Sequence, residues 1–372
     1  MINTNGGLFY GTLIDSGTLS SILKDLNGNT ITGGSGITCY RSGGSTGNSI
    51  ASRNNFYNDS GIRTFARVGY GHTLPTINDY CLENEVSEEI NINDILICAY
   101  GANDFMRYST SSVEGTGHTR NPDGTMCYEF TFYNNTDNAI TFYEIGLFVN
   151  ANNSQPVSPF MVARNVNPNG WIVPARENIT ITIELDFACN QMITRQGGRY
   201  FTSIFGSGQY GFYDYRGIEI TWTIDGRPTG ASGTTQAVTP NAYTGSSTYG
   251  TFARLGVGQS ANSEPQYTME QEELDGVNVN TTITCSSAVL YPNRTTNGKW
   301  DYTYTFNNSG SSSITVYEMG LFVRHPNAVF MIGRMVNENG WTFAAGESKT
   351  IVATIQLCGA TNEMETAPIN NG

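Results

Sequence analysis

The chain contains one sequence pattern twice, and this repeat constrains its fold more than any other feature. The hexamer YEIGLF at 143–148 returns as YEMGLF at 317–322. The flanking segments match in the same order: TFARVGYG (64–71) with TFARLGVG (251–258), and FMVARNVNPNGW (160–171) with FMIGRMVNENGW (330–341). Matches in one order, with gaps only in polar stretches, indicate two tandem copies of one structural unit.

Alternation within each copy predicts strands. YEFTFY (128–133) and WDYTYTF (300–306) carry a large aromatic residue at every second position, which is the period of a strand with one packed face. Turn-forming residues follow, and then the apolar runs 140–149 and 314–323. We expect each copy to contain a hairpin of these two long strands. The segments 179–187 and 350–357 are predicted to be closing strands.

Composition supports an all-β fold. The 372 residues include 42 glycines and 21 tyrosines, and only 14% of them are charged, a balance typical of strands and turns. The strand spacing predicts two tandem, internally repeated β-sandwich (jelly-roll-like) domains with extended connecting arms. The expected parts are an N-terminal arm with a short helix near Gly17–Leu26 (1–63), a first sandwich (64–188), an inter-repeat arm (189–250), a second sandwich (251–358) and a C-terminal tail (359–372).

The first copy contains a longer loop than the second. The shift between matched residues falls from 187 at Thr64/Thr251 to 174 at Tyr128/Tyr302, so the extra residues include much of 101–124. Loops absorb insertions and often carry recognition. Calcium ligation is the alternative, but the spacing of acidic and amide residues is not that of an EF-hand loop. The candidate interaction residues are Asp104, Arg107, His118, Arg120 and Asp123.

A carboxylate lies inside each apolar hexamer, at Glu144 and Glu318. Neither face of the predicted strand is polar, so we expect both side chains to be at least partly buried, where a carboxylate needs hydrogen bonds or a cation. Arginines recur with the hexamers and can offer two parallel donors to one carboxylate. The predicted structural ion pairs join Glu144 to Arg164 or Arg67, and Glu318 to Arg334 or Arg254.

The residues do not favour an enzyme. A pair of catalytic carboxylates would need a second positioned acid or a histidine in a cleft, but His72, His118 and His325 do not recur between the copies. The chain has no phosphate-binding loop. We therefore predict no catalytic residues, no metal site and no cofactor. Trp171 and Trp341 follow Asn-Gly turns and are expected to be packed anchors rather than sugar platforms.

Charge and cysteine usage narrow the partners. The net charge is −13 and no basic stripe is present, which argues against nucleic acid as a partner. Seven scattered cysteines show no zinc-like spacing and fit buried thiols in a reducing cytosol. We also expect no signal peptide and no membrane span.

The order of motifs resembles a β-sandwich module of virion proteins of tailed bacteriophages, including crAss-like phages. The resemblance rests on Gly69-Tyr70-Gly71, the Tyr-x-Leu-Glu of 80–83, the aromatic strand, the hexamer and a final A-x-E-x-x-T-I, and it covers 64–187 and 251–357. The module usually carries Thr-Pro-Thr near its start. Leu74-Pro75-Thr76 keeps most of it, whereas Ala261-Asn262-Ser263 does not.

The resemblance implies a non-enzymatic structural component of a virion, assembled in the cytoplasm of an infected bacterium. We expect a tail or neck protein that forms a multi-copy ring through its sandwiches and arms. Its partners would be other copies of itself and other virion proteins of the tail, neck, portal or capsid. The alternatives are a capsid decoration or head-fibre protein, or a receptor-binding adhesin. Glycan binding is not favoured by the residues.

Overall fold

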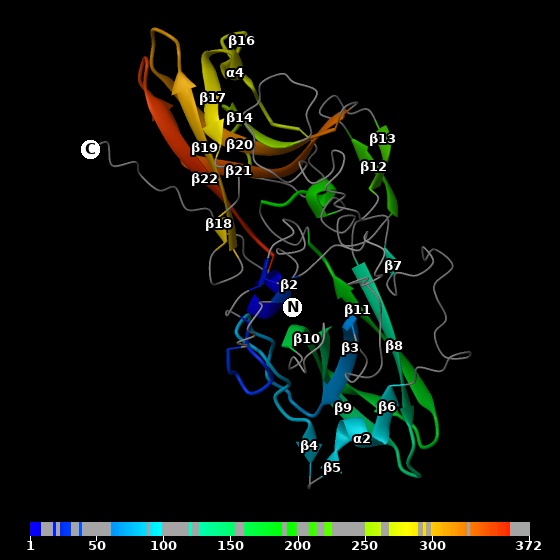
Figure 1. The fold of residues 1–372 in the computed structure, drawn as a ribbon. Coiled ribbons are helices and arrows are strands. Elements are labelled where there is room, and N and C mark those ends of the chain that lie inside the picture. The colour runs from blue at the N-terminus through cyan, green and yellow to red at the C-terminus, as the bar shows by residue number, and fades with distance from the viewer. Residues whose placement is uncertain are drawn as a thin grey trace.

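The protein is described by a computed structural model and consists mostly of antiparallel strands with few helices (Figure 1). Strands β3 to β11 occupy the lower part of that view, and most strands of the second half lie in the upper part. The N-terminus lies between them (Figure 1). The structure describes residues 1–8, 18–19, 23–30, 37–38, 61–87, 90–98, 119–120, 126–152, 160–187, 192–198, 208–213, 219–224, 250–261, 268–288, 293–294, 299–325 and 328–357.

The first half contains two larger sheets. Strand β9 pairs with β3 on one side and with β10 on the other, while β8 pairs with β11, β6 and β7. The short strands β4 and β5 form a separate pair next to the helical turn α2. The elements are β3 (Gly61–Gly69), β4 (Val86–Ser87), β5 (Ile90–Asn91), α2 (Ile92–Ile95), β6 (Leu96–Cys98), β7 (Thr119–Arg120), β8 (Met126–Asn134), β9 (Ile140–Asn152), β10 (Phe160–Val173) and β11 (Asn178–Leu185).

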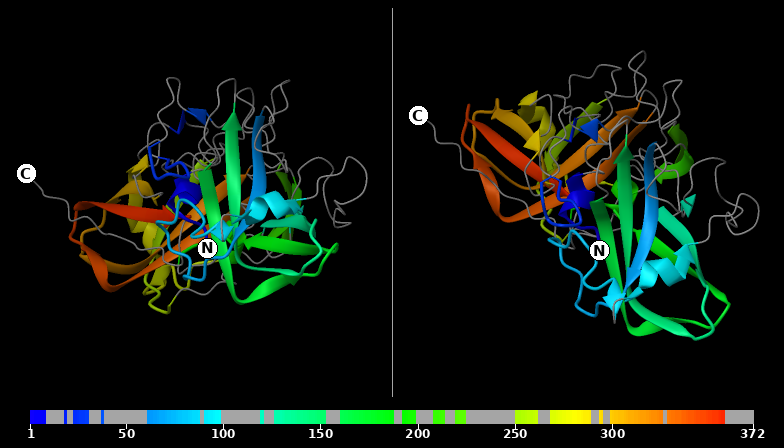
Figure 2. Two further views of the ribbon diagram at one scale, coloured as in Figure 1. Left: turned by 90° about the horizontal axis from the view of Figure 1, so that it is seen from below. Right: turned by 60° about the horizontal axis from the view of Figure 1, so that its bottom comes forward.

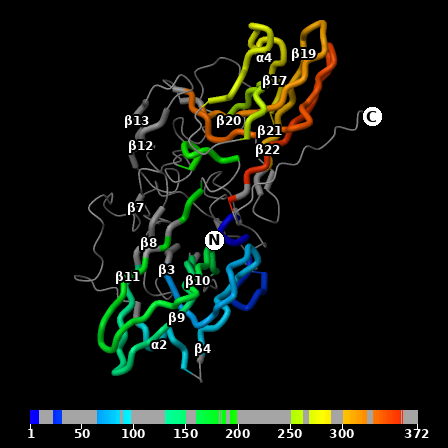
Figure 3. Tube along the Cα trace, turned by 180° about the vertical axis from the view of Figure 1, so that it is seen from behind, coloured from blue at the N-terminus to red at the C-terminus, as the bar shows by residue number. Residues whose placement is uncertain are grey.

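The second half pairs its strands in the same order. Strand β20 pairs with β14 and β21, while β19 pairs with β22, β17 and β18. Figure 3 shows α2 and α4 at opposite ends of the molecule. The elements are β14 (Gly250–Gly256), β15 (Glu273–Leu274), β16 (Val277–Asn278), α4 (Val279–Thr282), β17 (Ile283–Ala288), β18 (Asn293–Arg294), β19 (Lys299–Asn308), β20 (Ile314–His325), β21 (Ala328–Phe343) and β22 (Ser348–Gln356).

The predicted hairpins are wrong. The consecutive strands β8 and β9 do not pair with each other but belong to different sheets, and the same holds for β19 and β20. The aromatic faces of both strands point into a shared core, where the rings of Phe132 and Phe142 lie 6.0 Å apart. Asn134 fixes the crossing, because its side-chain amide donates to the carbonyl oxygens of Asn138 (2.7 Å) and Val173 (3.0 Å). Asn308 makes the equivalent bonds to Ser312 and Phe343.

The helix predicted near Gly17–Leu26 is also absent from the described part of that stretch. Thr18–Leu19 forms strand β1, which pairs with β2 (Ile37–Thr38). Lys24 pairs with Thr30 around a turn, and its backbone is held from both sides by the side chain of Asn5. The long-range contacts of this segment therefore outweigh its helical pattern of leucines.

The expected arms are only partly described. In the inter-repeat arm, β12 (Gly208–Tyr213) and β13 (Glu219–Ile224) form an antiparallel pair, whereas 225–249 lie outside the described residues. The expected C-terminal tail lies outside them as well.

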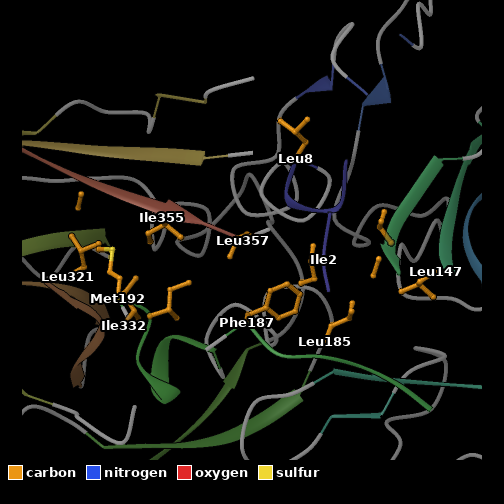
Figure 4. Close-up of a cluster of buried hydrophobic side chains, with 14 of the residues drawn as sticks. Ile2, Leu8, Leu147, Leu185, Phe187, Met192, Leu321, Ile332, Ile355 and Leu357 are labelled. Carbon is orange, nitrogen blue, oxygen red and sulfur yellow. The ribbon is translucent and has the colours of Figure 1, made fainter. Parts of the chain in front are cut away.

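Buried apolar side chains from both halves belong to one connected cluster. Figure 4 shows Ile2 and Leu8 among Leu185, Phe187 and Leu357. Both views of Figure 2 show the orange and red strands of the second half to one side of the blue and green strands of the first. The N-terminal residues are therefore part of the core rather than a free arm.

Candidate functional site

The two glutamates of the hexamers are fully buried, each with 0% exposure. In β9, Ile145 and Leu147 enter the main core, whereas Phe148 packs on the opposite face with Leu82. Glu144 shares this opposite face and lies beneath the loop of residues 70–85. The strand is therefore covered on both sides, which explains why the hexamer lacks an exposed polar face.

Glu144 accepts four hydrogen bonds. One comes from the side chain of Arg164, whose Nε lies 2.8 Å from Oε2. The other three come from loop backbone N–H groups, those of Gly71 (3.0 Å), Glu83 (3.0 Å) and Asn84 (2.9 Å). A carboxylate has about four acceptor positions, so this one is saturated.

Glu318 repeats the arrangement in the second half. Arg334 Nε donates to its Oε2 at 2.6 Å. The backbone N–H groups of Gly258 (3.2 Å), Glu270 (3.0 Å) and Gln271 (2.8 Å) complete the set. Each glutamate thus holds loop backbone against the outer face of a strand by charge-assisted hydrogen bonds.

Each arginine holds several groups at once. The Nη1 and Nη2 atoms of Arg164 donate to Asp79 (2.9 Å) and Glu83 (3.3 Å). The corresponding atoms of Arg334 donate to the Ser260 carbonyl oxygen (2.9 Å) and to Glu270 (3.2 Å). The first arginine therefore contacts three carboxylates, and the second has two carboxylates among its described contacts.

Glycines make room for the buried carboxylates. A Cβ atom on Gly71 would lie 2.6 Å from Glu144 Oε1, and one on Gly258 would lie 2.7 Å from Glu318 Oε1. Gly69 and Gly256 approach the same oxygens even more closely. The repeated G-x-G after each T-F-A-R segment is therefore required by close packing rather than by phosphate binding.

The structure shows which of the two candidate arginines in each copy pairs with the buried glutamate. Arg164 and Arg334 contact the buried glutamates, whereas Arg67 pairs with Glu85 and Arg254 with Glu272. Gly69, and not Arg67, stands opposite Glu144 in the β3–β9 register. Arg67 and Arg254 are partly exposed, and their ion pairs lie beside the buried clusters rather than within them.

Local contacts set the ionisation of the surrounding acids. Hydrogen bonds from the Thr73 backbone and hydroxyl hold the pKa of Glu83 below its ordinary value, and the Ser260 hydroxyl and N–H do the same for Glu270. Burial alone would raise the pKa of Asp79, but bonds from Thr76 and Arg164 outweigh it and the pKa is lowered. Burial raises the pKa of both Glu85 and Glu272, against the opposing effect of their arginine partners.

The other predicted residues do not join this site. Asp104, Arg107, His118 and Asp123 lie outside the described residues, and Arg120 lies in β7 opposite Met126. His72 packs on Tyr143 with ring centroids 3.9 Å apart. In the described part of the chain, no cluster of three or more His, Cys, Asp or Glu side chains is placed to hold a metal ion. None of its helices is long and apolar enough to span a membrane.

The two tryptophans that follow Asn-Gly turns are packed. Trp171 lies 5.3 Å from the Phe142 ring, and Trp341 is only 9% exposed. Gly170 and Gly340 adopt positive φ angles of 71° and 68°, as these turns require. Trp341 belongs to the core, and Trp171 is partly buried against it.

The loop amides are the part of the site that the sequence does not reveal. Six backbone N–H groups donate to the two carboxylates. Almost every residue type has such a group, so the sequence does not show which ones donate. The G-x-G spacing and the glutamate-bearing loops were the available signals. No known protein family, curated protein or solved structure matches this chain.

Proposed function

We propose that this chain is a non-enzymatic structural component of a bacteriophage virion, a tail or neck protein that assembles in a multi-copy ring. The observation that carries the proposal is the duplicated glutamate–arginine cluster. Both carboxylates are fully buried and each accepts four hydrogen bonds, so neither has an acceptor position left for a substrate or a reacting water.

We propose further that the two halves are copies of one jelly-roll-like β-sandwich. The equal order of strand pairing supports this, and so do contacts between the two sheets of each half, such as that of Phe132 on β8 with Phe142 on β9. One such contact is the hydrogen bond from the Tyr304 hydroxyl on β19 to the Thr251 carbonyl oxygen on β14, at 3.1 Å. The placement in a virion is supported by the sequence resemblance of both repeats.

A map of the intact particle tests the proposal. Purified phage particles would be digested and searched by mass spectrometry for this chain, and a cryo-electron microscopy map would be searched for its two sandwiches. We expect several symmetry-related copies at the tail or neck. Absence of the chain from particles would overturn the virion role, whereas copies on the capsid surface or at fibre tips would favour the decoration or adhesin alternatives.

Recombinant protein offers a second test. Light scattering after size-exclusion chromatography should show a discrete multimer, because ring proteins carry complementary side-to-side surfaces. A glycan array serves as the counter-test, since strong and selective glycan binding would favour the adhesin. Release of reducing sugar from polysaccharide would contradict the non-enzymatic assignment.

A further inference from the structure

Exposed apolar side chains are concentrated on two short hairpins, one in each half. We name them tip A (Val86–Asn91), which consists of β4 and β5, and tip B (Glu273–Asn278), which consists of β15 and β16. In the described part of the chain, eight large apolar side chains are exposed. Four of the eight lie on the tips: Val86 (46%), Ile90 (52%), Leu274 (38%) and Val277 (53%).

The two tips occupy equivalent places in the two copies. Val86 pairs with Asn91 in tip A, and Glu273 pairs with Asn278 in tip B. Both pairs are related by the 187-residue shift that also relates Thr64 to Thr251. By the same shift Ile90 corresponds to Val277, and both are β-branched and about half exposed.

Other exposed apolar residues do not recur in this way. Leu74 is 76% exposed, but its counterpart in the second copy is Ala261. Ile172 is 60% exposed, but its counterpart is Thr342. Singly scattered exposed apolar residues are normal on a protein surface, whereas a recurring apolar pair on a protruding hairpin indicates a contact surface.

The base of each tip is fixed to its half. The side-chain amide of Asn93, just after tip A, donates to the Val68 carbonyl oxygen on β3 (2.9 Å) and accepts from the Val68 N–H (3.0 Å). Asn280 makes the same two bonds with Leu255 on β14, both at 2.8 Å. The outer end of tip B protrudes, because a Cβ atom on Gly276 would meet no atom of the described residues within 4 Å. A fixed element loses little conformational freedom on binding.

Both tips are acidic. The segment 84–95 contains four Asp or Glu residues and no Lys, Arg or His, and the segment 271–282 contains three and none. In tip B, Glu273 and Asp275 are exposed beside the apolar pair. Electrostatic complementarity then calls for an apolar pocket with a basic rim. An anionic membrane surface is disfavoured, because it attracts basic rather than acidic segments.

We propose that tips A and B are two equivalent docking elements, and that each inserts its apolar pair into a basic-rimmed pocket on one other virion protein. This inference rests on the proposed function. A stable interface buries roughly 800 Å² per partner, so one small tip alone makes a weak contact. Figure 1 shows β4 and β5 at one end of the molecule and β16 at the other, so one chain presents the same element to two copies of the partner. Two linked contacts raise the overall affinity by about a hundredfold or more.

Photo-crosslinking in infected cells and in purified particles tests the proposal. A photoreactive amino acid would replace Ile90, Val277 or Ile172 in the full chain. We expect the first two variants to cross-link to the same site of one partner protein, with Lys or Arg beside the linked residue. Ile172 is the matched control, since it is as exposed as the tips but does not recur, and it should not give this product.

Other products would overturn the proposal. These are different partner proteins at the two tips, products with lipid or with a second copy of this chain, and yields no higher than at Ile172. Ile90→Asp tests whether the tips act together: it should lower cross-linking from position 277 by about tenfold or more without changing the urea midpoint, because the side chain is half exposed. An unchanged yield would refute docking at two points. Absence of the chain from particles would refute the proposed function, whereas its presence there without these products would refute only the docking.

Discussion

Replacing Glu318 with glutamine should destabilise the protein strongly, because this carboxylate accepts four hydrogen bonds while being fully buried. A glutamine side chain keeps the shape but replaces one accepting oxygen with an NH₂ group. Two of the four donors then lose their acceptor, at a cost of about 1–3 kcal/mol each. The loss of charge beside Arg334 adds to this, so the free energy of unfolding should fall by about 4 kcal/mol, in the range for a broken buried ion pair.

Glu144→Gln should cost about as much as Glu318→Gln. Both arginines keep a carboxylate partner after the substitution, because Arg164 also donates to Asp79 and Glu83 and Arg334 also donates to Glu270. Because Glu144 also accepts four hydrogen bonds, we expect a loss of about 4 kcal/mol there as well. Urea unfolding followed by tryptophan fluorescence measures both. Glu83→Gln is the matched control, because its side chain is 40% exposed and should change stability by less than about 1 kcal/mol.

The double variant Glu144→Leu/Arg164→Met tests whether the main role of Glu144 is to accept hydrogen bonds from the loop or to form an ion pair with Arg164. Replacing a buried ion pair with apolar residues is often neutral or stabilising. Here the backbone N–H groups of Gly71, Glu83 and Asn84 would still lack their acceptor, so the double variant should remain destabilised by at least about 2 kcal/mol. Wild-type stability in the double variant, or single variants within about 0.5 kcal/mol of wild type, would show that the loop amides do not depend on the buried glutamates.

Three further outcomes follow from the geometry. Gly69→Ala should lower the urea midpoint and release the loop, because its Cβ would overlap Glu144 Oε1; proteolysis of the loop at an unchanged rate would contradict this. Burial raises the pKa of Cys285 from 9.0 to about 11. Its thiol should therefore be alkylated about a hundredfold more slowly in the native protein than in urea at neutral to mildly alkaline pH. Peptide mass spectrometry measures both rates, and equal rates would contradict the burial of this thiol. The pKa values of Glu83 and Glu270 are below their ordinary 4.5 in the folded protein, so their stabilising contribution is present above pH 4.5 and is lost as the pH falls through the folded values. The urea midpoint should therefore drop in acid and drop less in Glu83→Gln/Glu270→Gln, whereas parallel pH profiles would argue against these contacts.

Residue types and periodicity were sufficient to predict a mostly antiparallel all-β chain. The alternating aromatics at 128–133 do mark a strand with a packed face. They do not reveal which strand it pairs with, because two aromatic faces can meet across a hairpin or across two sheets. The crossing depends on the side chain of Asn134, whose partners at 138 and 173 are not evident from local pattern.

The site was partly accessible to sequence reasoning. A glutamate in an apolar run demands a partner, and the recurrence of Arg164 and Arg334 narrowed the choice to two arginines per copy. Register decides between them, since Gly69 rather than Arg67 faces Glu144. Register and backbone donors both arise from tertiary contacts, so neither could be read from the residues.

The docking of residues 1–8 on β10 and of residues 192–198 on β21 was not predicted, because the pattern that these two segments share is short. Only Met, Ile and the Gly-Gly pair recur between 1–8 and 192–198, and the segments 1–63 and 189–250 were interpreted as arms. The recurring glycines were the available signal, since Gly6 and Gly197 are required by contact with a carbonyl oxygen on the edge strand.

Amide hydrogen exchange in the two loops measures whether the buried glutamates hold these loops in place through backbone hydrogen bonds. The N–H groups of Gly71, Glu83 and Asn84 contact Glu144, and those of Gly258, Glu270 and Gln271 contact Glu318. All six should exchange slowly in the wild-type protein. Glu144→Gln should accelerate only the first three and Glu318→Gln only the last three. Fast exchange of these amides in the wild-type protein, or protection that survives both substitutions, would contradict the account.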